Sequence, residues 1–184
     1  QKNVETEISD QGRGPKIGLI KLKNFMDENG CKSIAKEIES FESKAVQGIA
    51  LDLRGNGGGL LDQAVCIGGL FAGRKVIAKI KYLENGQQES RRAQTLGPKT
   101  NLPMITLIDS GSASASEILA GALQDHGRSW IAGQRSFGKA TVQAPELWNS
   151  ERFGSQILLY NTIARFYQPS GRTNQIVGIQ PDFE

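Results

Sequence analysis

The sequence predicts an α/β fold in one domain, because an apolar strand, a turn of small residues and a helix follow one another twice. Residues 48–53 form an apolar run that leads into the glycine turn 55–59, and a helical pattern follows. Residues 104–109 form a second apolar run, which leads into a serine-rich turn and another helical pattern. The 184 residues, 38% of them hydrophobic, provide enough chain for one sizeable core.

The chain opens with a polar stretch that contains two glycines and a proline. We expect residues 1–15 to form a linker or loose N-terminal arm and residues 16–184 to form the folded core. Alternating apolar residues predict strands, and apolar residues at helical spacing predict helices. The elements expected in the first half are a strand at 17–22, an amphipathic helix at 31–44, a strand at 48–53 and a helix at 60–71.

Turn signals organise the second half of the chain. Asn85-Gly86 is a dipeptide favoured in two-residue hairpin turns, so the strand at 75–82 is expected to return through the polar residues 87–101. Gly127 follows a helical pattern and ends it. The remaining elements are expected to be a strand at 104–109, a helix at 117–126, and strands at 130–133, 140–143 and 156–166.

Charge and composition argue against several classes of function. The net charge is only +3, and lysine and arginine are scattered along the chain, so nucleic acid is not expected as a partner. The longest apolar runs are too short to span a membrane, and no signal-peptide pattern opens the chain. Without a Cys-x-x-Cys pair or a histidine cluster, no metal is expected.

Cys31 and Cys66 are the two cysteines of the chain. Free cysteines are often buried and pack as small apolar residues, and we favour this interpretation for both. A disulfide is the alternative if the protein is exported, because disulfides persist in oxidising compartments. The distance between the two Cα atoms decides between free thiols and a disulfide, and the spacing of the cysteines along the chain does not reveal that distance.

Two glycine patterns resemble nucleotide-binding loops but are incomplete. Residues 133–139 match the first seven positions of a P-loop, but Ala140 stands where a serine or threonine would bind magnesium. Residues 55–60 fail the dinucleotide-binding pattern at Leu60. We therefore expect no cofactor.

The serine-rich turn lies directly before a helix and suggests nucleophilic catalysis. A helix N-terminus presents unpaired N–H groups and a positive dipole end, which stabilise an oxyanion. A serine hydroxyl also needs a base to remove its proton. His126 lies at the opposite end of the same predicted helix, roughly 18 Å from Ser114 at 1.5 Å per residue, so it cannot be that base. The competing serines are Ser110, Ser112, Ser114 and Ser116.

Lys139 is the candidate base. Phe137 and Val142 flank it, and no acidic residue lies within several positions. Burial disfavours the charged form of a lysine, and an uncharged lysine can accept a proton. Beside the nucleophile, Ser112 is expected to cap the helix, with Glu117 adding a favourable negative charge in the first turn.

Several segments, in this order, resemble the C-terminal processing peptidases, also called tail-specific proteases. The likeness covers roughly residues 16–184 and implies a crotonase-like β-β-α superhelix as the core. Departures are small: Ser136 stands where threonine is common, and Ala140 where glycine is common. The matching segments are residues 51–59, 112–117, 124–128, 136–143, 164–172 and 178–182.

The resemblance implies a role for each residue of the site. Ser114 would be the nucleophile and Lys139 the base, and Gln143 would orient the lysine. Members of the family usually carry a PDZ domain just upstream of the core, and no segment here is long enough to be one.

An oxyanion hole needs two N–H donors aimed at one point. The first is expected from Ala115, and the second from Gly58 or Gly59, because a residue without a side chain lets the backbone approach a substrate. Arg54 and Asp125 are expected to brace the site through ion pairs.

The resemblance implies a serine endopeptidase that cleaves protein substrates near their C-termini through an acyl-enzyme. The substrate would bind in extended form beside an exposed strand. A PDZ domain or an adaptor absent from this chain is an expected partner, and the expected location is the periplasm or another extracytoplasmic compartment. Two alternatives are a non-catalytic peptide-binding scaffold that retains the fold and an acyl-thioester enzyme of the related crotonase fold.

Overall fold

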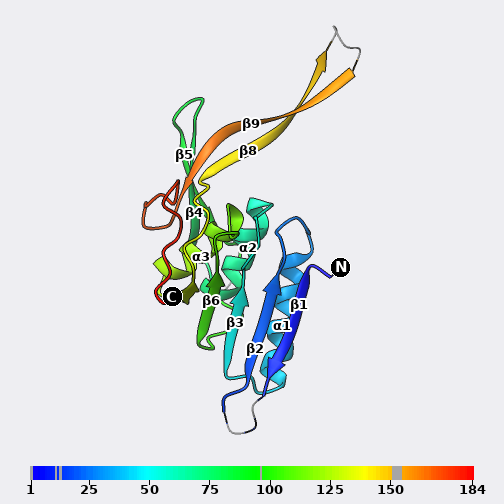
Figure 1. Ribbon diagram of the computed structural model, residues 1–184, viewed down its shortest axis with the longest axis vertical. Helices are drawn as coiled ribbons and strands as arrows, with labels where there is room; N and C mark the ends of the chain where they lie inside the picture. The colour runs from blue at the N-terminus through cyan, green and yellow to red at the C-terminus, as the bar shows by residue number, and fades with distance from the viewer. Residues whose placement is uncertain (1, 11, 13, 96, 151–154) are drawn as a thin grey trace.

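The computed structural model describes residues 2–10, 12, 14–95, 97–150 and 155–184. The described chain contains both helices and sheets, so the predicted α/β class is confirmed (Figure 1). The helices are α1 (Gly30–Ser43), α2 (Leu61–Ala72) and α3 (Ala115–Asp125). The strands are β1 (Val4–Ser9), β2 (Ile17–Leu22), β3 (Gly48–Asp52), β4 (Val76–Tyr82), β5 (Gln88–Arg92), β6 (Met104–Ile108), β7 (Trp130–Gly133), β8 (Thr141–Ser150) and β9 (Ser155–Tyr167).

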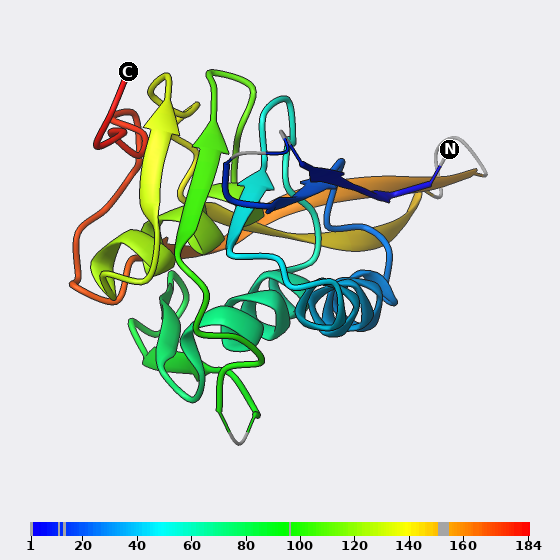
Figure 2. The ribbon, with the colours of Figure 1, turned by 90° about the horizontal axis from the view of Figure 1, so that it is seen from below.

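A five-stranded sheet with the order β1-β2-β3-β6-β7 forms the centre of the molecule. Strands β2, β3, β6 and β7 run parallel, and β1 pairs antiparallel with β2. The helices cover one face of this sheet (Figure 2). Parallel neighbours end at the same edge, so the turns that follow β3 and β6 lie side by side.

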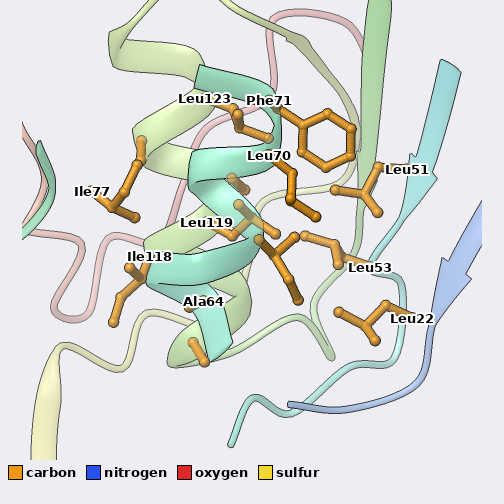
Figure 3. Close-up of a cluster of buried hydrophobic side chains, with 14 of the residues drawn as sticks. Leu22, Leu51, Leu53, Ala64, Leu70, Phe71, Ile77, Ile118, Leu119 and Leu123 are labelled. Carbon is orange, nitrogen blue, oxygen red and sulfur yellow. The ribbon is translucent and has the colours of Figure 1, made fainter. Parts of the chain in front are cut away.

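The hydrophobic core lies between this sheet and the helices. Apolar residues of α2 and α3 recur at helical spacing and face inward, where Leu119 and Leu123 are fully buried. They meet Leu51 and Leu53 from the end of β3 (Figure 3). Burial of apolar surface, at about 25 cal/mol per Å², is the main favourable term that holds the layers together. None of the described helices is long and apolar enough to span a membrane.

A four-stranded sheet with the order β5-β4-β9-β8 extends into a long hairpin. Strands β8 and β9 pair from Thr141 and Arg165 to Ser150 and Ser155, and they project from the body as a two-stranded ribbon (Figure 1). Both strands are longer than the predicted 140–143 and 156–166. The length that β8 gains lies mostly on the projecting part of the hairpin, where exposed side chains give no burial pattern that marks a strand end. Strand β9 exceeds its prediction by only one residue at each end.

The β4–β5 hairpin has a longer loop than predicted. Lys81 pairs with Gln88, and the Tyr82 N–H donates to the Gln87 carbonyl, so residues 83–86 form the loop instead of two residues. Gly86 has a φ of +70°, a conformation that favours glycine. The Asn-Gly pair therefore identifies the hairpin but not the length of its loop.

Residues 4–9, expected to belong to a loose arm, form β1 instead. Val4 pairs with Leu22 and is only 3% exposed. The side chains of Val4, Thr6 and Ile8 alternate with polar ones, which is the pattern of a strand with one buried face. The segment has few apolar residues, so its composition resembles that of a linker.

Cys31 and Cys66 form a disulfide, so the prediction of two free thiols is wrong. The packing of α1 against α2 places their Cα atoms 6.0 Å apart, a separation that a disulfide can bridge. A cross-link between residues 35 positions apart stabilises the fold by about 4 kcal/mol in the chain-entropy description. The cysteines meet only because α1 packs against α2, and this packing cannot be predicted from the spacing of the cysteines in the sequence.

Gly133 provides a test of the packing between β6 and β7. Its φ is +115°, and a Cβ there would lie 2.2 Å from the Ile108 carbonyl oxygen. Gly133→Ala should lower the free energy of unfolding by roughly 2–4 kcal/mol, because backbone strain and steric overlap add. Gly86→Ala is the matched control, since Gly86 also has a positive φ but a Cβ added there would meet no atom within 4 Å. Equal losses for both variants in urea unfolding would contradict the role of the Ile108 contact.

Candidate active site

The turns after β3 and β6 are joined at the carboxyl edge of the five-stranded sheet. The Gly55 N–H donates to the Asp109 carboxylate at 2.8 Å. The Ser112 hydroxyl donates to the Leu53 carbonyl, also at 2.8 Å. These bonds hold the glycine turn against the serine turn.

Asn56 is a central residue of this region that the sequence analysis did not single out. Its side chain is fully buried, donates to the Leu22 carbonyl at 2.8 Å and accepts from the Gly58 N–H at 2.9 Å. Its carbonyl accepts from the Ala113 N–H and the Ser116 hydroxyl. A buried amide with all these partners rigidifies both turns. The available signal was a polar residue between glycines directly after a buried strand.

Ser114 lies where the serine turn becomes α3, and it is the N-cap residue of that helix. Its φ of +56° and ψ of −113° are disfavoured for a residue with a side chain and cost about 1–3 kcal/mol. Strain of this kind is concentrated at functional sites. Ser112, expected to cap the helix, is instead buried against Leu53, because α3 begins only at Ala115.

The N-terminal ends of two helices lie close to Ser114. Gly58, three residues before α2, packs so tightly that a Cβ there would lie 2.9 Å from both the Ala115 nitrogen and the Ser114 Cβ. Ala115 is the first residue of α3. The positive ends of both helix dipoles therefore favour negative charge at this place.

The candidate oxyanion donors differ in their availability. Among the described residues, the N–H groups of Ala115 and Gly59 donate to no acceptor. The Gly58 N–H already donates to the Asn56 side chain at 2.9 Å. Of the two expected glycines, the geometry therefore favours Gly59.

Glu117, in the first turn of α3, is fully buried and joins the serine turn to the lysine segment. One carboxylate oxygen accepts from the N–H groups of Ser114 at 2.8 Å and Lys139 at 2.9 Å. The other accepts from the Ser136 hydroxyl at 2.6 Å and the Gly138 N–H at 2.7 Å. These charge-assisted bonds offset the cost of burying the carboxylate.

The shared carboxylate oxygen brings the backbones of Ser114 and Lys139 together. Two nitrogens within 2.9 Å of one oxygen lie no more than about 6 Å from each other. The Lys139 Nζ in turn donates to the Gln143 side-chain carbonyl at 2.9 Å. Lys139 is half-buried, whereas Gln143 is exposed near the start of β8. The expected contact between these two side chains is present.

Arg54 and Asp125 form ion pairs with separate partners. Arg54 donates two hydrogen bonds of 2.9 Å to Asp52. Burial raises the pKa of Asp52, but the hydrogen bonds and charge of Arg54 outweigh burial and hold that pKa below its usual value. Asp125 pairs with Arg172 at 2.9 Å, at the end of α3 opposite Ser114.

His126 also lies at the far end of α3. It is the C-cap residue, and its Nε2 lies 2.7 Å from the Val76 carbonyl oxygen. This position agrees with the expectation that it is not the base for Ser114.

Gln168 supports the site from the C-terminal segment. Its side chain is fully buried and donates to the Glu117 carbonyl at 3.0 Å and to Asn174 at 3.4 Å. Gln168 lies in one of the matching segments, but its sequence context alone indicates no role for it. A buried amide cannot be recognised from sequence until its partners are known.

A strained serine at the start of a helix, with a lysine segment beside it in an α/β fold, is an arrangement that suits the class of serine-type peptidases. The family model of peptidase family S41 matches residues 16–184, and the chain belongs to this family. The predicted resemblance is therefore confirmed.

The chain is similar to longer carboxyl-terminal processing proteases. It is 35% identical over 179 residues to the carboxy-terminal processing protease CtpA of Bacillus subtilis (strain 168), covering 97% of this chain and 36% of CtpA. It is 36% identical over 182 residues to a carboxyl-terminal-processing protease of Synechocystis sp., covering 97% of this chain and 40% of that protease. The photosystem II D1 C-terminal processing protease has a similar structure, with a TM-score of 0.83 and 28% identity. The match covers 99% of this chain and 48% of that protease chain. The chain spans less than half the length of these proteins.

Glu117→Gln should disrupt the site. A glutamine side chain offers one carbonyl oxygen, and its NH₂ group would face two of the donors that the carboxylate now accepts. We expect peptidase activity to fall by about 10²-fold or more and the free energy of unfolding by roughly 2–4 kcal/mol. Glu84→Gln, an exposed residue of the β4–β5 loop, is the matched control. Full activity with unchanged stability in Glu117→Gln would contradict the role of the carboxylate.

Proposed function

We propose that the chain is the catalytic core of a serine endopeptidase that uses Ser114 as nucleophile and Lys139 as base. The observation that carries the proposal is the Glu117 carboxylate, which binds the backbone N–H groups of both residues through one oxygen. Two segments far apart in the chain thereby meet at a strained serine. The contact from Lys139 to Gln143 supports the assignment of the base.

The proposed reaction proceeds through an acyl-enzyme. The Ser114 hydroxyl attacks the scissile carbonyl carbon while uncharged Lys139 accepts its proton. Lys139 then protonates the leaving amine, and the acyl group remains as an ester on Ser114. Water attacks the ester with Lys139 as base, which releases the acid and restores the serine.

The negative charge of the tetrahedral intermediate needs donors that are already in place. The N–H groups of Ala115 and Gly59, together with the N-terminal ends of α2 and α3, are the proposed oxyanion hole. Gly58 contributes by letting its turn approach Ser114, where any side chain would overlap. Asn56 positions this turn from within the core.

The surroundings of the site suit an extended polypeptide with apolar side chains. Met26, Leu60 and Phe137 are exposed, and each neighbours a residue of the site in sequence or space. Strand β8, which carries Gln143, is the last strand in the order of its sheet. An extended substrate could therefore add to this edge through main-chain hydrogen bonds, as in β-augmentation.

For the whole protein we propose cleavage near substrate C-termini, in line with the names of its longer relatives. A PDZ domain or an adaptor is a proposed partner. An extracytoplasmic location, such as the periplasm, is supported by the disulfide, because disulfides persist in oxidising compartments.

The proposed roles of Ser114 and Lys139 are tested by labelling and kinetics. A fluorophosphonate should label wild-type protein at Ser114, and Ser114→Ala should lose both labelling and peptide cleavage, whereas Ser110→Ala, an exposed serine of the same turn, should retain both. Lys139→Arg should be inactive, since a guanidinium does not release its proton, while His126→Ala should remain active. Cleavage by Ser114→Ala at the wild-type rate would refute the mechanism. Protein that shows neither labelling nor cleavage would instead favour the peptide-binding scaffold.

Gln143 gives a pH-dependent test of how the base is held. Gln143→Ala should lower kcat by about 10²-fold, by analogy with the loss of an orienting group from a catalytic triad. Gln143→Glu should be impaired at neutral pH, because a nearby anion stabilises the protonated lysine, and should recover partly at alkaline pH. The exposed Gln88→Ala on β5 is the control. Wild-type kinetics for both Gln143 variants at every pH would show that the contact is not catalytic.

A further inference from the structure

The two sulfurs of the disulfide occupy different environments. Cys31, in the first turn of α1, is buried with 5% of its surface exposed. Cys66, in the middle of α2, is exposed and lines an open groove of about 1240 Å³ between α2 on one side and β5 with the residues that follow it on the other. A thiol that enters this groove therefore meets Cys66, and the buried position shields Cys31.

We propose that Cys66 is a thiol–disulfide exchange site for thiols and dithiols, with Cys31 as the leaving group. A thiolate attacks the Cys66 sulfur, a mixed disulfide forms there, and the bond to Cys31 breaks. The second sulfur of a dithiol then attacks the mixed disulfide and releases Cys66. The dithiol is oxidised to a disulfide by two electrons, both protein cysteines are reduced, and the two protons of the dithiol pass to them.

Helix α1 favours this direction of attack. Thiol exchange is faster when the departing sulfur is well stabilised as a thiolate. Cys31 leaves at the N-terminus of a helix of 14 residues that has no acidic residue in its first turn. The positive end of the helix dipole stabilises a thiolate at that position. Cys66 lies in mid-helix, without such an end.

The cross-link also bears on the glycine turn. The loop before α1 binds that turn through two backbone bonds: the Phe25 N–H donates to the Gly58 carbonyl at 2.9 Å, and the Leu60 N–H donates to the Phe25 carbonyl at 3.0 Å. The Gln63 side chain on α2 accepts from the Cys31 N–H and donates to the Glu28 carbonyl. Loop, α1 and the start of α2 thus form one unit that the disulfide closes covalently.

Reduction should therefore loosen the glycine turn relative to the Ala115 N–H. This part of the inference depends on the proposed peptidase function, since it concerns the oxyanion hole. We expect kcat to fall by about 10-fold on reduction, less than the 10²–10³-fold loss seen when a whole oxyanion donor is removed. KM should change little, because the bonds affected are made to the transition state.

The exchange site is tested by chemical trapping on the oxidised full chain. Limiting glutathione is added, the reaction is quenched with iodoacetamide, and peptides are mapped by mass. Since the chain has only two cysteines, every thiol product reports on this pair. We expect glutathione on Cys66 and the alkyl group on Cys31. The reverse pattern, or a disulfide that resists a large excess of dithiothreitol under native conditions, would overturn the assignment.

The coupling to activity is tested with oxidised and dithiothreitol-reduced protein side by side. The Cys31→Ser/Cys66→Ser variant should have the low kcat of the reduced wild type and should not respond to dithiothreitol, with circular dichroism verifying its fold. If that variant does not fold, reduced and alkylated wild type takes its place. Equal kcat for oxidised and reduced protein would refute the coupling. Inactive oxidised wild type would refute the peptidase proposal, while the trapping result would still decide the exchange site.

Discussion

A buried carboxylate is the constraint on which the rest of the site depends. Glu117 has four donors from the serine turn and the lysine segment, and each must be in place because an unsatisfied buried charge costs several kcal/mol. If either segment moves away, the carboxylate is left without partners that it needs. The backbones of Ser114 and Lys139, the nucleophile and the base that we propose, are therefore assembled together, as one cooperative unit, and not as two independent loops.

Three other parts of the fold position the serine turn and the lysine segment around Glu117. The parallel strands β3 and β6 deliver two turns to one edge, and Asn56 joins those turns from within. The C-terminal segment reaches back through Gln168, which donates to the Glu117 backbone. Asp125 and Arg172 fasten the same segment at the far end of α3. Residues remote from Ser114 thus act on it through packing and hydrogen bonds that converge on Glu117.

Periodicity alone predicts most elements, and β2 and β7 have the expected bounds. In β2 every second residue is buried, which gives a clear strand pattern. The Lys139–Gln143 contact is also foreseeable, since matching motifs place both residues. What sequence reasoning missed depends on tertiary neighbours: β1 needs β2 beside it, and the disulfide needs α1 against α2. The helix start was misplaced for a similar reason. Ser112 and Ser114 are equally good caps by type, and only the bond from Ser112 to Leu53 separates them.

The backbone of Ser114 has a consequence for how this site tolerates change. Its φ of +56° and ψ of −113° belong to a region that glycine enters freely and serine does not. A glycine at this one position would relieve local strain and remove the hydroxyl at the same time. If Ser114 is the nucleophile that we propose, stability and reactivity favour different residues at position 114. Selection for stability alone would then replace the serine, and only the need for its chemistry would retain it.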